Sequence, residues 1–473
     1  MTAPKRDIYL LSPKELSPET IAVTFAKTSR SPESFREIAR DLNDEKSSQF
    51  HEKWVLGYGH ASVAEHAVLH LAIENASRLA MEAIESNRLA SYTEKSTRYQ
   101  KWSTDHFFIP PELDGHPLRD EYVITCRRLF EAYSESLEPV RQQVEKKSPR
   151  REGESQDTWD RRIRSQYVDV CRFLLPAASL ANVGMTANGR VLESSIRKWR
   201  SSPLAEVREI GETVKENARA EIPTLLKYAE PLPYLQETSL DLTTLASAID
   251  VDHTASEWCT LLEADPQGEK RILAAALYRF GGMSYQQAFE TVTNYPDLPA
   301  LAGVLLGRLG RFDVPLRELE YSTYTFDLVM DQGAYAEFKR HRMMTQTPQR
   351  LTCALGYAVP RLLLDAGVEL QYRQAMDAAR DAWQNLANWN MDVAQYVVPN
   401  GYNRRVLAAF NLREAFAFCQ LRTSANAHFS IRRIAQRMAV EIQRVHPLLA
   451  GYMRLQDESW QGIEEEYFAS VWG

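Results

Sequence analysis

Several short segments place charged and hydroxyl side chains where they could hold an anionic nucleotide or cofactor. In the segment 94–99, Glu-Lys-Ser-Thr-Arg-Tyr, an extended backbone would point Glu94, Ser96 and Arg98 to the same face. Arg98 suits a phosphate, Ser96 adds a hydroxyl, and Glu94 accepts hydrogen bonds from a base or a sugar. The segment predicts a cradle for a nucleoside monophosphate, with a solvated polar loop as the alternative.

A second segment, Arg340-His341-Arg342, sets three cationic or potentially cationic side chains in a row. Such a triplet makes a local anion site of the kind that a diphosphate requires. An exposed basic run is the alternative, but the apolar neighbours Phe338 and Met343 favour a folded setting.

The third segment contains His60, Ser62, Glu65 and His66. It lacks the HExxH pattern of a zinc helix and has no evident third ligand, so we expect no metal site. Ser62 and Glu65 have the spacing of a capping box. The helix start that a capping box marks is itself a place where anions bind.

The fourth group consists of arginines, asparagines and one histidine among apolar residues late in each half of the chain. A buried arginine needs a partner or a ligand, because an unpaired buried charge is costly. Internal salt bridges are the alternative for each. The group comprises Arg172, Asn188, Arg190, Arg197 and Arg200 in the first half, and Asn411, Arg413, Arg422, Asn426 and His428 in the second.

Two halves of the chain resemble each other. The segments 170–176 and 188–190 resemble 393–399 and 411–413 at a constant offset of 223 residues, and 86–91 resembles 340–345 at an offset of 254. The larger offset indicates extra residues in the first half, and the charged stretch 145–154 is expected to be a solvated insertion. We therefore predict domains at 1–235 and 250–473, joined after the proline-containing segment 230–234.

Helical periodicity dominates both predicted domains. Apolar residues recur at spacings of three and four over 67–88, 194–215 and 432–445, and β-rich runs occur at 7–11 and 321–328. Without regular βαβ alternation, the pattern predicts a helix-rich α+β fold. The sequence contains no GxGxxG or P-loop motif, which argues against Rossmann or Walker nucleotide binding.

Composition narrows the function classes further. The net charge of −7 argues against nucleic-acid binding, and no apolar stretch approaches the length of a membrane span. The five cysteines are scattered without metal-ligand spacing, so we expect a reduced, cytoplasmic protein.

Taken together, these motifs resemble those of the flavin-dependent thymidylate synthases. Gly59–His66 is similar to the family's HxSxxEH element, 86–99 to most of its RHRxxSxNExSxRY signature, and 170–176 to its VxRxxLP segment. The second half keeps Arg340-His341-Arg342 but has lost the nucleotide part of the signature and carries Gln395 in place of the arginine of VxRxxLP. The two halves thus show complementary losses.

The resemblance implies a set of sites divided between the halves. The catalytic candidate is Arg200 or Arg422, with Arg197 as a possible equivalent of Arg200, and Glu318 or Glu320 is a vestige of the lost HxSxxEH element. The resemblance assigns the nucleotide to Glu94, Ser96, Arg98, Tyr99 and Arg172. It assigns FAD to His60, Ser62, Glu65, Asn188, Arg190, Arg340, His341, Arg342, Asn411 and Arg413.

By the same resemblance, reduced FAD would carry a one-carbon unit from methylenetetrahydrofolate to C5 of dUMP, with NADPH as the reductant. Two chains would form a homodimer that rebuilds the family's tetramer. Two alternatives stay open. One is a related flavoenzyme that modifies another pyrimidine nucleotide or transfers a hydroxymethyl group, and the other is a non-catalytic nucleotide- or FAD-binding protein.

Overall fold

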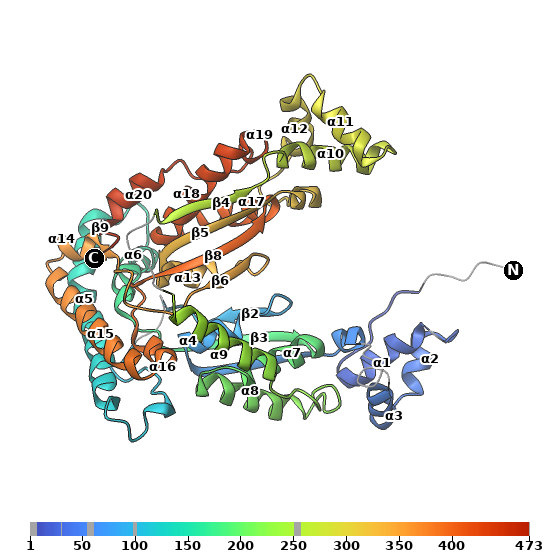
Figure 1. Cartoon of the computed structure of the whole chain (residues 1–473), viewed down its shortest axis with the longest axis horizontal. Helices are drawn as coiled ribbons and strands as arrows, with labels where there is room; N and C mark the ends of the chain where they lie inside the picture. The colour runs from blue at the N-terminus through green and yellow to red at the C-terminus, as the bar shows by residue number, and fades with distance from the viewer. Residues whose placement is uncertain (1–6, 30, 54–60, 98–101, 250–256, 473) are drawn as a thin grey trace. The chain divides into compact units, whose positions relative to one another are not determined.

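The computed structural model describes residues 7–29, 31–53, 61–97, 102–249 and 257–472. The chain forms two compact units (Figure 1). Unit 1 comprises Met1–Lys95, Pro110–Asp114 and Leu180–Val251, and unit 2 comprises Ser96–Ile109, Gly115–Ser179 and Asp252–Gly473. No helix in the described part of the chain is both long and apolar enough to span a bilayer.

Unit 1 is built on a three-stranded antiparallel sheet in the order β1-β3-β2. Ser77 ends β1 and caps the next helix, α4, by accepting a hydrogen bond from Ala80 N. The elements of unit 1 are α1 (Pro18–Thr28), α2 (Phe35–Arg40), α3 (Asp44–Phe50), η2 (Ala61–His66), β1 (Val68–Ser77), α4 (Arg78–Ile84), β2 (Ser91–Glu94), η4 (Pro111–Leu113), β3 (Leu180–Asn188), α7 (Gly189–Arg200), α8 (Ala205–Ala218) and α9 (Pro233–Ser247).

Unit 2 contains a four-stranded sheet, β4-β5-β8-β6, and a small pair, β7-β9. Its first elements are α5 (Arg119–Lys147), α6 (Gln156–Cys171), η5 (Arg172–Leu174), β4 (Cys259–Ala264), α10 (Gly268–Gly281), α11 (Tyr285–Thr293), α12 (Leu298–Leu306), η6 (Arg317–Tyr321), β5 (Thr323–Asp331), α13 (Gln332–Phe338) and β6 (Thr345–Pro348). The remainder are β7 (Val359–Pro360), α14 (Arg361–Asp365), α15 (Glu369–Trp389), α16 (Met391–Ala394), η7 (Gln395–Val397), β8 (Asn403–Asn411), α17 (Leu412–Arg422), α18 (Phe429–Val445), α19 (Pro447–Ala450), α20 (Trp460–Tyr467) and β9 (Phe468–Ser470).

The core of unit 2 lies against one face of this sheet. Alternate residues of β5 and β8 are buried there, and Phe326 stacks on Phe410 with ring centroids 5.7 Å apart. Helices α13, α17 and α18 contribute apolar side chains to the same core. The predicted strand at 321–328 and the predicted helix at 432–445 are confirmed as β5 and α18.

The strand order β1-β3-β2 of unit 1 recurs in unit 2 as β5-β8-β6, to which β4 adds a fourth strand. Ser91 of β2 pairs with Thr186 of β3, and Thr345 of β6 pairs with Ala409 of β8. These pairs differ by offsets of 254 and 223, the two values that the sequence repeat predicts. Helices α4 and α7 have α13 and α17 as their counterparts at the same offsets. The helix-rich α+β fold is confirmed.

The charged stretch is solvated as predicted, because residues 148–155 form a largely exposed, non-helical segment between α5 and α6, and the two flanking helices are longer than their counterparts in the second half. Helix α5 has 29 residues against 21 in its counterpart α15, and α6 has 16 residues against 4 in α16. Helix α5 packs against α15 inside unit 2, where Asn385 donates to Glu121 at 2.8 Å. The compact units therefore follow a different boundary from the sequence repeat.

Three predicted elements differ in the structure. The described residues 7–11 form no strand, and 67–88 is β1 followed by α4 rather than one helix. A bulge between Ile73 and Ala76 breaks the two-residue alternation of β1, which hides the strand from a periodicity analysis. The predicted helix at 194–215 is divided before Pro203 into α7 and α8.

A buried carboxylate anchors the junction of β1 and α4 and allows a test of the unit 1 fold. Glu206 accepts hydrogen bonds from Ser77 N and Ser77 Oγ, both at 2.6 Å, and is 3% exposed. Glu206→Ala leaves both donors unsatisfied, so we expect the free energy of unfolding to fall by about 1–3 kcal/mol. Urea denaturation measures the loss, and exposed Glu209→Ala on the same helix is the control. Equal stability of the two variants would contradict this role.

Candidate functional site

Arg422, the last residue of α17, lies in a polar cluster with the predicted basic triplet. Its Nη1 contacts Glu337 Oε2 at 2.8 Å, its Nη2 donates to the Glu337 carbonyl at 3.2 Å, and its Nε donates to His341 Nε2 at 3.0 Å. The Arg422 side chain is only 12% exposed, and burial lowers its pKa. The N-cap of α13 at Asp331 and that of α17 at Asn411 set the two helices that carry these residues.

The contacts of His341 define its protonation state. Arginine can only donate, so His341 Nε2 must be the acceptor and carries no proton. The proton then lies on Nδ1, which contacts Glu414 Oε1 at 3.1 Å. Burial lowers the pKa of His341, which keeps the ring neutral with this tautomer. His341 therefore orients Arg422 rather than adding a positive charge.

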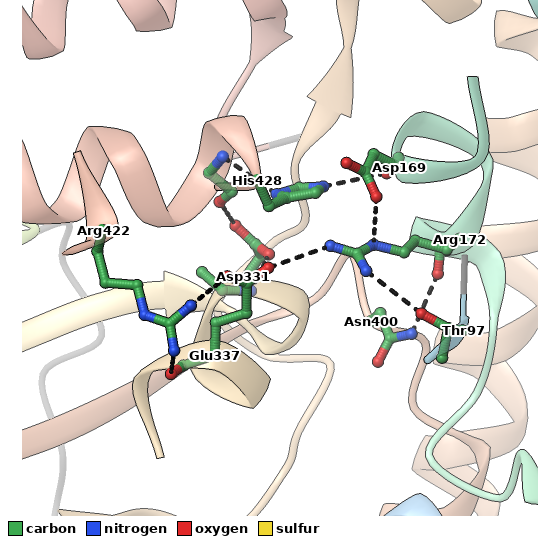
Figure 2. A network of polar contacts seen from close by, with 10 residues as sticks. Thr97, Asp169, Arg172, Asp331, Glu337, Asn400, Arg422 and His428 are labelled. Carbon is green, nitrogen blue, oxygen red and sulfur yellow. Dashed lines mark hydrogen bonds and ion pairs between the residues drawn. The ribbon is translucent and has the colours of Figure 1, made fainter. Parts of the chain in front are cut away.

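Arg172, in η5, approaches the same carboxylate from the other side (Figure 2). Its Nη2 lies 3.5 Å from Glu337 Oε1, its Nε lies 3.4 Å from Asp169 Oδ1, and its Nη1 donates to Thr97 Oγ1 at 3.3 Å. The side chain is 13% exposed, and Nε and Nη2 form no hydrogen bond with any residue that the structure describes. Arg172 thus keeps hydrogen-bonding capacity that an anionic ligand could use.

His428 and Asp331 complete the network in Figure 2. His428 Nδ1 accepts from Ser430 N at 3.1 Å, so its Nε2 carries the proton and donates to the Asp169 carbonyl at 3.1 Å. Asp331 accepts from Ser430 Oγ, and burial raises the pKa of its carboxyl. These contacts connect the start of α18 to the residues around Arg172.

The position of Arg422 is occupied by Trp199 in the first half, at the repeat offset of 223. Trp199 Nε1 donates to the Ala83 carbonyl at 3.1 Å, just as Arg422 Nη2 donates to the carbonyl of Glu337, the counterpart of Ala83. Arg200, the next residue, instead pairs with Glu212 at 2.6 Å and with Glu230 at 2.9 Å. Arg197 pairs with Glu193 on its own helix.

The flavin candidates of unit 1 border a cavity of about 630 Å³, which lies within the usual volume range of small-molecule pockets. Ser62, Glu65 and His66 line it, and the His66 ring lies 4.7 Å from that of Phe25. Arg190 pairs with Glu65 at 2.5 Å. The capping-box prediction is wrong, because Ser62 lies inside η2 rather than before an α-helix.

The second half repeats the Glu65–Arg190 ion pair. Arg413 contacts Glu320 at 2.9 Å, which identifies Glu320 rather than Glu318 as the remnant of the lost element. Asn188 and Asn411 cap α7 and α17, each accepting one backbone hydrogen bond at 2.9 Å. Their side chains therefore hold the helix starts in both halves.

The predicted nucleotide cradle is only partly described. Glu94 is buried and pairs with Arg78 at 2.9 Å, so its carboxylate already has a cationic partner, and Ser96 is exposed. Arg98, Tyr99 and the flavin candidate His60 lie outside the described residues. In unit 2, Arg340 is exposed and Arg342 is half-buried.

The sequence interpretation missed the carboxylates that hold the arginines. Glu337 precedes His341 by four residues, and Glu414 directly follows Arg413. An acidic residue next to each predicted cation is a signal that a search for ion-pair partners would have found. Asp169 was equally visible, three residues before Arg172.

The duplicated sheet-and-helix unit and its buried arginines define a tandem α+β protein with candidate anion sites. The family described as thymidylate synthase complementing protein matches residues 11–224 and 260–448. A UPF0159 protein of Chlamydia muridarum is 32% identical over 446 residues, which cover 89% of this chain and 84% of the relative. The chain belongs to this family, twice over.

Further similarities cover single halves. A flavin-dependent thymidylate synthase of Clostridium tetani is 27% identical over 218 residues, 46% of this chain and 83% of the relative. Among solved structures, the flavin-dependent thymidylate synthase of Helicobacter pylori, complexed with FAD and dUMP, is 18% identical, with a TM-score of 0.32, over 42% of this chain and 100% of its own.

The buried ring of His428 predicts a pH dependence of stability. Burial lowers its pKa from 6.5 to about 4, so the unfolded state binds the proton more readily. The stability contributed by the neutral ring is complete above the unfolded pKa and is lost as the pH falls from 6.5 towards 4. The full loss is about 3 kcal/mol.

His428→Asn keeps an N-cap side chain and removes the titration. We expect the difference in unfolding free energy between wild type and variant to shrink between pH 7 and pH 4. Denaturation curves at several pH values measure it. A constant difference across this range would show that the pKa of His428 is the same in the folded and unfolded states, and would contradict an effect of burial on it.

Proposed function

We propose that this chain is a flavin-dependent enzyme that transfers a one-carbon unit to C5 of dUMP. Methylenetetrahydrofolate would be the carbon donor and NADPH the reductant. The membership of the chain in the thymidylate synthase complementing protein family supports this proposal, as do the similarities of its halves to flavin-dependent thymidylate synthases. We further propose that the chain consists of two tandem domains, 1–235 and 250–473, and forms a homodimer in the cytoplasm.

The observation that carries the proposal is the convergence of Arg172 and Arg422 on Glu337. Arg172 comes from the predicted nucleotide motif of the first half, and Arg422 follows the flavin motif of the second. Arg172 would bind the nucleotide phosphate through its guanidinium group, whose Nε and Nη2 face Asp169 and Glu337 at 3.4 and 3.5 Å without forming hydrogen bonds. Arg422, oriented by His341 and Glu337, would stabilise negative charge on the pyrimidine ring during transfer.

The second half has lost its own version of the nucleotide site. Gln395 stands at the position equivalent to Arg172, and Leu351 at the position equivalent to Thr97. Gln395 Oε1 accepts a hydrogen bond from Leu351 N at 3.1 Å. Arg350, the residue before Leu351, pairs with Asp392 at 2.9 Å. These polar groups have partners within the protein. We therefore assign nucleotide binding to the first-half motif, with Glu94, Ser96, Arg98, Tyr99 and Arg172 as its proposed residues.

The residues present fit FAD by their chemistry. In unit 1 the cavity lined by Ser62 and Glu65 has the volume of a small-molecule pocket, but its lining in the described part of the chain carries Glu33, Asp41 and Glu65 against Lys27 alone. The diphosphate would therefore need cationic side chains outside that lining, and the candidates are Arg190 in unit 1 and, separately, Arg340 and Arg342 in unit 2. The further flavin candidates are His60, His341, Asn188, Asn411 and Arg413. When bound, FAD would supply the redox chemistry of the transfer.

A second candidate function is the modification of a different pyrimidine nucleotide. Gln346, next to the basic triplet, donates its side-chain amide to the carbonyls of Phe338 and His341 at 3.3 and 2.9 Å. This contact and Thr93 alter the family signature near the expected substrate. Turnover of another pyrimidine nucleotide, without turnover of dUMP, would favour this second function. Flavin-dependent turnover of dUMP or of another nucleotide would exclude a non-catalytic binding protein.

Flavin retention is the first test of the proposal. After incubation with FAD and desalting, the wild type is expected to keep a visible flavin absorbance band. Arg342→Ala is expected to lose about tenfold or more in FAD affinity, because a charge-assisted contact is removed. Lys339→Ala, a change of a nearby cation outside the predicted triplet, is the control. A colourless wild-type protein would contradict the flavin assignment.

The two arginines are tested by steady-state kinetics. Arg422→Lys keeps the charge but loses the planar fork, so we expect kcat to fall by about 100-fold or more. Arg172→Lys is expected to raise the KM for dUMP by about tenfold or more. Arg350→Ala, which breaks the Arg350–Asp392 ion pair of the second half, is the control.

The same kinetics decide between Arg422 and the alternative Arg200. Because Trp199 stands in the place of Arg422, Arg200→Lys is expected to leave kcat near the wild-type value. A large loss of kcat at Arg200 with none at Arg422 would reverse the assignment. Thermal unfolding of each variant separates loss of chemistry from loss of folding.

A further inference from the structure

Unit 2 contains a second cavity, of about 690 Å³, that the proposed reaction does not use. Its walls come from the end of α5, residues 161–170 of α6, the loop before α18 and the end of α20. The α6 wall belongs to the segment that has no full counterpart in the second half, where α16 has only 4 residues. The cavity is therefore a product of the insertion.

Cationic groups outnumber anionic ones on the lining. Lys147, Arg161 and Arg432 carry positive charge, and Asp169 and Glu466 carry negative charge. Asp169 is already paired with Arg172, and Lys147 contacts Asp365 at 2.5 Å, a pair that a ligand would have to share. Arg161 is exposed and uses its Nε on the Asp157 carbonyl of its own helix, which leaves its two terminal nitrogens as donors for a ligand.

Arg432 is the most informative residue of the lining. Its side chain is 9% exposed, its Nη2 contacts Glu458 at 3.1 Å, and its guanidinium lies over the Tyr467 ring at 5.0 Å. Its buried Nε has no hydrogen-bond partner among the residues that the structure describes. A buried N–H without a partner is costly, and a ligand acceptor in the cavity would satisfy it.

The start of α18 adds to the positive potential. Asn426 and Phe429, on either side of the N-cap His428, line the cavity. The N-terminus of this 17-residue helix carries the positive end of the helix dipole. The N-terminus of α18 and the buried Arg432 are thus two independent features of one cavity that favour anions.

We propose that this cavity binds a small multivalent oxyanion, a phosphate ester or a polycarboxylate, through Arg161, Lys147 and the Nε of Arg432. The Gln166 carboxamide, whose oxygen accepts from Ser148 Oγ at 3.2 Å, can donate its amide to the same ligand. This site does not depend on the proposed function.

The cavity adjoins the Arg172 network at Asp169. Asp169 lines the cavity, its carboxylate contacts Arg172 at 3.4 Å, and its carbonyl accepts from His428 at 3.1 Å. An anion in the cavity would act on the carboxylate that positions Arg172. Occupancy of the site is therefore expected to change the affinity of unit 2 for ligands of Arg172.

The test is isothermal titration calorimetry of the full chain at ~0.15 M salt, where non-specific surface attraction is screened. Inorganic pyrophosphate and citrate are the two probes, so that phosphate and carboxylate sources are distinguished. We expect at least one of them to bind saturably. Arg161→Ala, an exposed position, is expected to weaken that binding by about tenfold, and Lys147→Ala by a similar factor.

Arg150→Ala is the matched control, because Arg150 is an exposed arginine of the same inserted segment outside the lining. Neither Arg150→Ala nor Arg161→Ala alters the candidate nucleotide and flavin residues. A probe bound at those residues would therefore bind both variants as it binds the wild type. Absence of saturable binding by both probes would overturn the proposal. Equal weakening by Arg150→Ala and Arg161→Ala would also overturn it, because it would reveal general surface charge.

Discussion

The need to neutralise buried guanidinium groups shapes the candidate site of this protein. Arg172 and Arg422 lie almost out of solvent, and both contact the single carboxylate of Glu337. A buried charge without a partner is far more costly than an exposed one, so Glu337 and Asp169 are as necessary as the arginines they face. The neutral tautomer of His341 follows from the same constraint, because a third positive charge in this place would be unfavourable.

The duplication explains how such a site could diverge without loss of the fold. Three strands keep the same order in both halves, β1-β3-β2 and β5-β8-β6, and Asn188 and Asn411 cap equivalent helices. Trp199 replaces Arg422 and still donates a hydrogen bond to the equivalent carbonyl. The backbone carbonyl therefore receives a hydrogen bond in both halves, but only Arg422 places a positive charge at this position. The chemistry of each half can change because the side chains that cap helices and fill cores stay in place.

The inserted helical segment shows how the second unit gained a new surface. The longer α5 and α6 pack with elements of the second half, and α6 forms one wall of the cavity beside Asp169. Extra residues of this charged composition look like a loop in the sequence. The charged stretch itself is an exposed segment over 148–155, and the residues after it form a helix because α6 begins at a serine cap, Ser155, and buries Ile163 and Val168 on one face.

The sequence alone determined the fold class, the tandem repeat with its two offsets and the residue types of the candidate sites, because these follow from composition, motif spacing and self-similarity. It did not reveal β1, since a bulge breaks the alternation that marks a strand. Only the tertiary structure decided that Arg172 faces Glu337, that Trp199 stands where Arg422 does, and that Glu320 is the partner of Arg413. These depend on contacts between segments far apart in the chain, where burial and charge pairing, rather than local spacing, select the neighbours.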